Sequence, residues 1–220
     1  MPRCTSLICA CLIALILAAT ARADTINVTK APPKIERKTF DPANLPKPAP
    51  PLHEHEIAVC EYLYRIEVDL KFTPLTVAPA PGGGVRASVR VDSAAIRLSM
   101  PITVWLPKGV DDQVKAHEDG HKAIAEFFYK DADKAAREAA KGVVGREVEA
   151  DGKDKNAAMR AALGKAAEEI SQKYMASVKD PCAQAQAKFD EITDHSNNRE
   201  LKSDAAAAQV LEKWKNEAKK

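Results

Sequence analysis

The chain lacks a surplus of charge, since 33 Lys and Arg residues nearly balance 31 Asp and Glu residues and leave a formal net charge of +2. Proteins that hold nucleic acid or an anionic membrane surface usually concentrate basic residues against the phosphate groups. The composition therefore argues against a nucleic-acid partner and against binding to anionic lipid.

A long hydrophobic run is also missing. The main apolar stretch, residues 7–19, is shorter than the roughly 20 residues that a membrane-spanning helix needs. It follows Arg3 and precedes a small-x-small cleavage pattern at residues 21–23, so residues 1–23 resemble a secretory signal peptide. We therefore expect a secreted or periplasmic protein with no stable membrane anchor after signal cleavage.

Cysteine is scarce beyond this segment, where only Cys60 and Cys182 remain. The three cysteines within it follow no lipoprotein-type pattern, so we expect no lipidation. In an oxidising compartment an isolated pair most simply forms a disulfide, and the sequence predicts one between Cys60 and Cys182 that ties the front of the fold to its back. Two unpaired thiols are the alternative.

Proline marks the first part of the mature chain. Seven prolines fall within residues 32–51, and such sequence favours extended, unpaired backbone, so residues 24–52 are expected to form a flexible leader. Alternating apolar and polar residues then predict strands within 57–70, 85–92 and 94–106.

Helical spacing dominates the rest of the chain. Helices are expected at residues 112–141, 146–179, 182–193 and 199–218, with Pro181 ending the second of them. Strands first and helices after predict an α+β fold class, with N-terminal antiparallel strands followed by a mostly helical C-terminal half. The main domain is expected at residues 53–198, followed by a charged helix at residues 199–220.

The most specific signal is the pentapeptide HEDGH at residues 117–121, which has the form H-E-x-x-H. Histidines four apart lie above one another on a helix, so both rings reach one metal ion while the glutamate reaches a water molecule. Apolar residues recur on the same helix face (Val114, Ile124, Phe128). The pattern predicts a zinc site with His117 and His121 as ligands and Glu118 as the catalytic general base.

Two residues inside the pentapeptide are unusual. Asp119 puts a charge where zinc peptidases usually carry an uncharged residue, and we expect it to face solvent or to orient a ligand. Gly120 costs about 1 kcal/mol within a helix. Its expected reason is the close approach of another backbone element, as where a strand crosses the metal helix.

A catalytic zinc site needs a third protein ligand. Two candidates follow the pentapeptide: His195, in a polar segment, and Glu147, which begins an E-x-x-x-D pattern ending at Asp151. A neutral imidazole binds zinc well and does not reduce the double positive charge that the ion brings to the site. A carboxylate ligand lowers that charge and weakens the metal as a Lewis acid, so the residue types leave both candidates open.

These features resemble a family of bacterial proteins described as secreted zinc-dependent proteases, from a domain of unknown function. The resemblance spans about residues 55–200 and rests on H-E-x-G-H and a late D-x-x-T-x-H segment, which is matched by Asp190, Thr193 and His195. The export signal and a strand with Trp105 ahead of the helix also fit. The family usually has glycine after the last histidine, where this chain has Ser196.

The resemblance implies a zincin-like fold, zinc as the cofactor, Glu118 as the catalytic residue and His117 and His121 as ligands. It favours His195 as the third ligand. We therefore expect a secreted zinc metalloendopeptidase-like hydrolase, which cuts a peptide or protein substrate with a zinc-activated water and Glu118 as base.

Other readings stay open. One is a non-catalytic cell-envelope protein with a structural metal site and a partner-binding helical surface, and another is an amidase that acts on cell-wall peptide links with the same metal chemistry. For a peptidase, we expect an extended substrate to pair with the edge of the strand before the metal helix, at residues 102–106.

Overall fold

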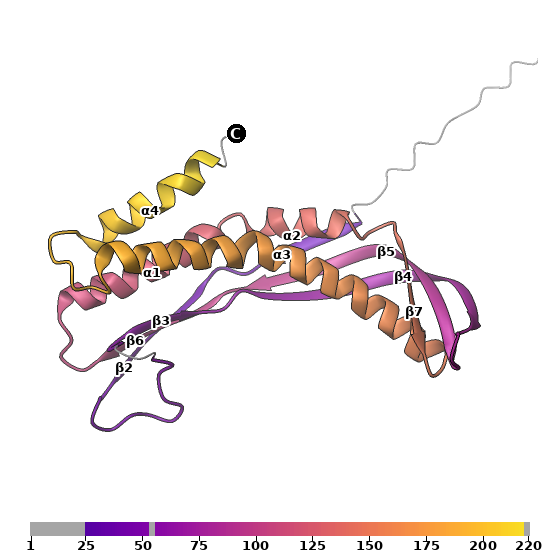
Figure 1. Ribbon diagram of the computed structural model, residues 1–220, viewed down its shortest axis with the longest axis horizontal. Helices are drawn as coiled ribbons and strands as arrows, with labels where there is room; N and C mark the ends of the chain where they lie inside the picture. Colours follow the sequence, from indigo (N-terminus) through magenta and orange to yellow (C-terminus); the bar gives the residue numbers. More distant parts are fainter. Residues whose placement is uncertain (1–24, 53–55, 218–220) are drawn as a thin grey trace, which may run out of the picture.

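The computed structural model describes residues 25–52 and 56–217 and has an α+β fold with mixed sheets. Figure 1 shows an elongated, curved molecule in which helices cover one face of a long layer of strands. The expected signal peptide lies outside the described residues. Within the described part of the chain, no helix combines the length and apolar character that spanning a membrane requires.

The middle of the layer is nearly one continuous strand. β5 (Val85–Ser99) leads into β6 (Pro101–Pro107) with only Met100 between them. β4 (Arg65–Pro79) runs antiparallel to β5, and β3 (Val59–Tyr62) runs antiparallel to β6. The interruption at Met100 divides the layer into a four-stranded and a three-stranded sheet.

Residues 24–52, expected to be a flexible leader, instead contribute two strands. β1 (Ile26–Lys30) runs parallel to β5, and β2 (Lys34–Phe40) runs parallel to β6. The extended backbone that this sequence favours is also the backbone of a strand, and pairing satisfies its N–H and C=O groups. The sheets are therefore mixed rather than antiparallel, and the fold begins well before residue 53.

The helix expected at residues 112–141 is divided into α1 (Asp112–Tyr129) and α2 (Ala132–Lys141). Asp111 caps α1, since its side chain accepts a hydrogen bond from the backbone N–H of Val114. After α2 the chain forms a strand, β7 (Glu147–Gly152), which pairs antiparallel with β5. The expected start of a second helix at residue 146 is therefore wrong.

α3 (Lys155–Thr193) is one helix of 39 residues, about 58 Å long. It runs along almost the whole strand layer (Figure 1). Pro181, expected to end a helix, lies inside it, because the buried face continues on both sides through Val178 and Cys182. Packing of that face outweighs the hydrogen bond that proline cannot make.

α4 (Ser203–Glu217) takes the place of the charged helix expected at residues 199–220. It is not only a solvated element, because Ala206, Val210 and Leu211 are buried in the main core. Trp214 also packs edge-on against Phe128 of α1, with ring centroids 5.4 Å apart. The C-terminal segment thus belongs to the same domain as the pentapeptide at residues 117–121.

The core lies between the strand layer and the inner faces of the helices. α3 contributes a buried stripe with helical spacing (Ala158, Ala162, Ala166, Ile170, Tyr174, Val178, Cys182, Ala185, Phe189). The strands contribute alternate residues (Val89, Val91, Ile96, Leu98, Ile102, Val104). The many alanines in the helix stripe allow α3 to approach the sheet closely.

Two further expectations fail in this part of the fold. β6 lies between β2 and β3, so residues 102–106 have no free edge on which a substrate could pair. The expected disulfide is absent, since Cys60 of β3 and Cys182 of α3 are buried free thiols. The sulfur of Cys182 instead accepts hydrogen bonds from the tyrosine side chains of residues 62 and 64.

Burial also disfavours the thiolate form of both cysteines. Burial raises the pKa of Cys60 to about 12, and burial likewise raises the pKa of Cys182. A thiol that stays protonated is neither a good nucleophile nor ready to oxidise. Both cysteines therefore serve the core in this structure.

Candidate metal centre

α1 brings the two histidines of the pentapeptide together as the spacing predicts. His117 and His121 have ring centroids 4.6 Å apart, and their Nε2 atoms are 3.0 Å apart. Both lie on the face of α1 that looks toward α3, and His117 is only 5% exposed. The local helix geometry therefore supplies two nitrogen donors aimed at one point.

The third donor is Asp190, from the last turn of α3. Its Oδ1 lies 3.3 Å from Nε2 of His117 and 2.9 Å from Nε2 of His121. Donors around a tetrahedral zinc ion are roughly 3.3 Å apart when each lies about 2.0–2.1 Å from the metal. Among the described residues, these three form a group whose ligand atoms all lie within 4.8 Å of one another.

His195, expected as the third ligand, lies close by but outside this group. Its side chain is 70% exposed, and its Nδ1 is 3.8 Å from Oδ1 of Asp190. The reason is that α3 continues to Thr193, which keeps Asp190 on the helix face toward α1, whereas His195 follows the end of that helix. The structure thus gives the third position to the aspartate of the D-x-x-T-x-H segment.

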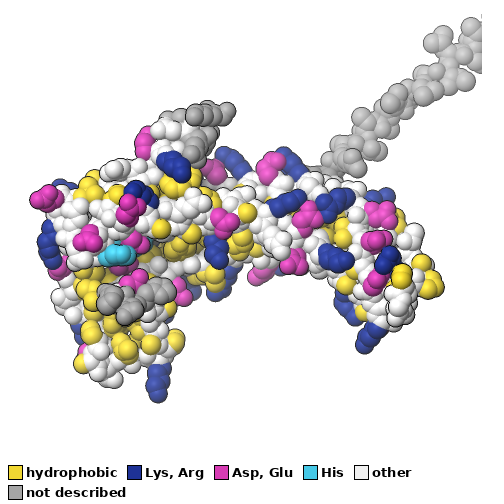
Figure 2. Space-filling view, in the orientation of Figure 1, with side chains coloured by type: hydrophobic (Ala, Val, Ile, Leu, Met, Phe, Trp, Pro, Cys, Tyr) yellow, Lys and Arg dark blue, Asp and Glu magenta, His cyan; other side chains and the backbone are white. Residues whose placement is uncertain are grey.

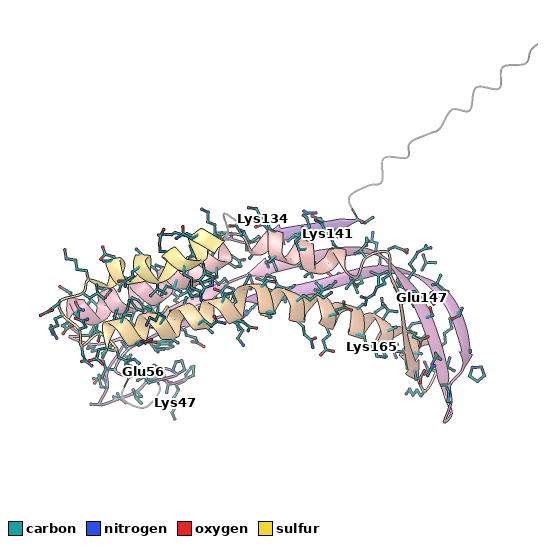
Figure 3. All side chains as sticks on the ribbon, turned by 45° about the horizontal axis from the view of Figure 1, so that its top comes forward. Lys47, Glu56, Lys134, Lys141, Glu147 and Lys165 are labelled. Atoms are coloured by element: carbon teal, nitrogen blue, oxygen red, sulfur yellow. The ribbon has the colours of Figure 1, made fainter. Side chains whose placement is uncertain are left out.

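Glu147, the other candidate, lies in β7 and hydrogen-bonds to Ser88 of β5. Figure 3 shows it at the opposite end of the molecule from Glu56, a residue whose charge acts on Glu118. A carboxylate at that end cannot reach the histidines. Glu147 as a ligand is therefore wrong.

Gln186 contacts His121 at two points. Its side-chain oxygen lies 2.6 Å from Nδ1 of His121, and its side-chain nitrogen donates to the main-chain oxygen of His121 at 2.9 Å. Since the amide nitrogen is used in this way, the amide oxygen must accept, and Nδ1 of His121 must carry the proton. The neutral ring then presents a lone pair at Nε2, toward His117 and Asp190.

The donor set fits a metal cation. Two imidazole nitrogens and a carboxylate oxygen about 3 Å apart repel one another unless a proton or a metal ion lies among them. Two imidazoles and one carboxylate form a ligand set that zinc uses in catalytic sites, with a further position left for water or substrate. The chemistry of the residues present therefore matches the cofactor expected from the sequence.

The electrostatics of the centre follow from burial and the shared carboxylate. Burial lowers the pKa of His117, and it also acts to lower the pKa of His121. The hydrogen bond and charge of Asp190, together with Gln186, outweigh burial at His121 and raise its pKa. Burial acts to raise the pKa of Asp190, but the two imidazoles hold it well below its usual range. Without metal, the carboxylate of Asp190 therefore stabilises the protonated form of His121, and the two imidazoles stabilise the ionised form of Asp190.

Glu118 lies next to this centre, on the side of α1 that meets β3. It is 4% exposed, its carboxylate hydrogen-bonds to the backbone N–H of Cys60, and its Oε2 has no partner among the described residues. Burial raises the pKa of Glu118 to about 7, and the charges of Glu56 and Asp190 add to the rise, while His121 opposes it. A carboxyl group that gains and loses its proton near neutral pH is suited to acid–base chemistry.

The two unusual residues of the pentapeptide have structural reasons. A Cβ atom at Gly120 would overlap the ring of Phe189, which stacks on His117 with centroids 4.9 Å apart. Glycine is thus needed for close approach, although the partner is a helix side chain rather than a crossing strand. Asp119 forms surface ion pairs with Arg37 and Lys122.

Solvent reaches the centre from the end of α3. The exposure of the side chains increases from 7% at His117 through 15% at His121 and 27% at Asp190 to 70% at His195. On the face shown in Figure 2, histidine reaches the surface at the end of the molecule where α3 finishes. The solvent-accessible side of the centre is therefore the side of Asp190 and His195.

Comparison with known proteins identifies no relative: no family model, no curated protein and no solved structure matches the chain. Sequence reasoning missed the roles of Gln186, Phe189 and Asp190. These three residues could have been found from their helical spacing, because positions 186, 189 and 190 lie on one side of α3, the side that faces the pentapeptide.

Proposed function

We propose that the protein is an exported zinc-dependent peptidase with a zincin-like site. The observation that carries the proposal is the convergence of His117, His121 and Asp190 beside the buried carboxyl group of Glu118. A metal ligand set next to a carboxyl group that titrates near neutral pH is the minimum equipment for metal-assisted hydrolysis.

The residues have distinct roles in this proposal. His117, His121 and Asp190 hold the ion, and zinc, when bound, supplies a Lewis acid that polarises a carbonyl and acidifies a water molecule. Glu118 accepts the proton of the attacking water and passes it to the departing amine. The low exposure of His117 and Glu118 keeps bulk water from competing with this transfer.

The experiment begins with the mature protein. We expect bound zinc close to one ion per chain by elemental analysis, and cleavage of a peptide library by the wild type. Glu118→Gln should keep the zinc and lose about 100-fold or more in cleavage rate, in line with removal of a general base. Absence of zinc from wild-type protein supplied with zinc would refute the proposal.

A second candidate is a non-catalytic envelope protein with a structural metal. It is favoured by His195, whose Nδ1 lies only 3.8 Å from Asp190 and which would need little movement to close the fourth position. The same experiment separates the two. Retained zinc, no cleavage by the wild type and a large loss of thermal stability on chelation would support the structural role.

A further inference from the structure

We infer that Gln186 is a positioning residue that holds His121 in the tautomer able to bind metal. The inference rests on the metal site of the proposed function and extends it to a residue outside the ligand set. Gln186 is 8% exposed and lies one turn before Asp190 on α3. One helix therefore delivers both a ligand and the group that orients another ligand.

The amide of Gln186 holds His121 at two points. Its oxygen accepts from Nδ1 of the ring at 2.6 Å, and its nitrogen donates to the main-chain oxygen of the same residue at 2.9 Å. These two bonds fix the ring relative to its own backbone. They also set the orientation of the amide, because a flipped amide would place its oxygen against the main-chain oxygen of His121, acceptor to acceptor.

The surroundings of the Gln186 amide are consistent with a role in orienting His121. Its nitrogen lies 3.8 Å from Sγ of Cys182, a buried thiol whose pKa is raised by burial. In the neutral ring, with Nδ1 of His121 committed as a donor, Nε2 keeps its lone pair and lies 2.9 Å from Oδ1 of Asp190. A residue in this position sets the donor atom of the ligand, and loss of such a contact typically costs 10–100-fold in metal affinity.

The test uses Gln186→Met, which keeps the shape of the side chain and removes both hydrogen bonds. Zinc affinity, measured by competition with a chromophoric chelator, should fall about 10–100-fold. Gln184→Met is the matched control, because Gln184 lies on the same helix and is exposed; its affinity should equal that of the wild type. Gln186→Glu restores an acceptor for Nδ1 and should recover part of the loss.

A second measurement does not depend on bound metal. The ¹⁵N shifts of the imidazole nitrogens, recorded on metal-free protein at a pH well above the imidazole pKa, report which nitrogen carries the proton. Wild-type His121 should carry it on Nδ1, and Gln186→Met should shift the proton toward Nε2. His121→Ala identifies the signals by their disappearance.

The outcomes are distinguishable. A wild-type His121 protonated on Nε2, or a folded Gln186→Met variant with unchanged zinc affinity, would overturn the role of Gln186. If the wild type binds no zinc but carries the proton on Nδ1, the proposed function fails while the positioning of His121 stands. If Gln186→Met does not fold, the wild-type tautomer and the Gln186→Glu affinity decide the matter.

Discussion

At the scale of single residues, Asp190 turns a pair of histidines into a three-donor centre. The carboxylate lies within 3.3 Å of both Nε2 atoms and lowers the charge that a divalent ion would bring into a buried place. We expect Asp190→Asn to weaken zinc binding by more than about 100-fold, since even loss of a residue that only orients a ligand costs 10–100-fold.

His195→Ala is the matched comparison for Asp190→Asn. The exposed ring lies outside the group of converging donors, so this variant should change zinc affinity by less than about tenfold. Both affinities can be measured by the same competition titration. If His195→Ala loses zinc while Asp190→Asn retains it, the third ligand is the histidine that the sequence resemblance implies, and the assignment of Asp190 is wrong.

Proton competition at His121 predicts how zinc binding depends on pH. Asp190 and Gln186 outweigh burial and raise the pKa of His121 in the metal-free protein, and zinc binds only the unprotonated ring. Zinc affinity should therefore fall as the pH drops through that raised pKa, by up to about tenfold per pH unit for one displaced proton. Titrations over a pH series check this.

The folding stability of the metal-free protein depends on pH in the opposite direction to zinc affinity. A raised pKa in the folded state adds stability below the unfolded pKa, and this contribution is lost as the pH rises through the folded value. The stabilisation that zinc brings, measured as the difference between melts with zinc and with chelator, should thus increase from acidic toward neutral pH. A stabilisation that stays constant across this range would exclude proton competition at His121.

The residues of the centre differ in how far the sequence alone reveals them. His117, Glu118 and His121 lie within five positions, so helix geometry alone relates them and the prediction of a convergent pair is confirmed. Asp190 and Gln186 depend on how α3 packs against α1, which no local pattern encodes. The helix was expected to stop at Pro181, and this hid the face on which both residues lie.

At the scale of elements, the turn that ends α3 holds three consecutive residues in the left-handed region. Asp194, His195 and Ser196 have φ values of 47°, 48° and 74°. For residues with a Cβ atom this conformation costs roughly 1–2 kcal/mol each. The turn is held by backbone bonds from His195 to Asp190 and from Asn198 to Thr193, so packing and hydrogen bonding outweigh the local preference.

Ser196→Gly should stabilise the protein by about 0.5–1 kcal/mol, because glycine removes the left-handed cost and returns part of the gain as unfolded-state entropy. Chemical denaturation measures the change. Ser177→Gly is the control on the same helix, where the residue is in regular α conformation, and it should destabilise by about 0.5 kcal/mol. If both variants changed the unfolding free energy in the same direction, the interpretation of a strained turn would be wrong.

The strain of this turn cannot be read from the sequence. A φ of 74° at Ser196 is a conformation that glycine adopts without cost but that a residue with a Cβ atom adopts only at a cost. Only the coordinates give the sign of φ, so the residue type at position 196 does not reveal the strain.

At the scale of the whole molecule, the first strands hold the layer together along its length. β1 and β2 pair with β5 and β6, and Lys30 and Ala31 connect the sheet to α1 and α2 through Tyr129 and Asp133. Composition suggested a flexible segment because seven prolines fall within residues 32–51. Tertiary pairing decided otherwise, which a local reading of residues 24–52 could not anticipate.

Two substitutions in β2 test whether this segment is structural. Phe40 is 3% exposed and Ile35 is 45% exposed on the same strand. Phe40→Ala should cost about 3–5 kcal/mol of unfolding free energy, because it empties a filled core position, whereas Ile35→Ala should change it by less than about 0.5–1 kcal/mol. Thermal and urea melts of the mature protein provide the measurement. A flexible leader would make both substitutions neutral, so equal stabilities for Phe40→Ala and the wild type would remove β2 from the folded domain and with it the parallel half of the sheet.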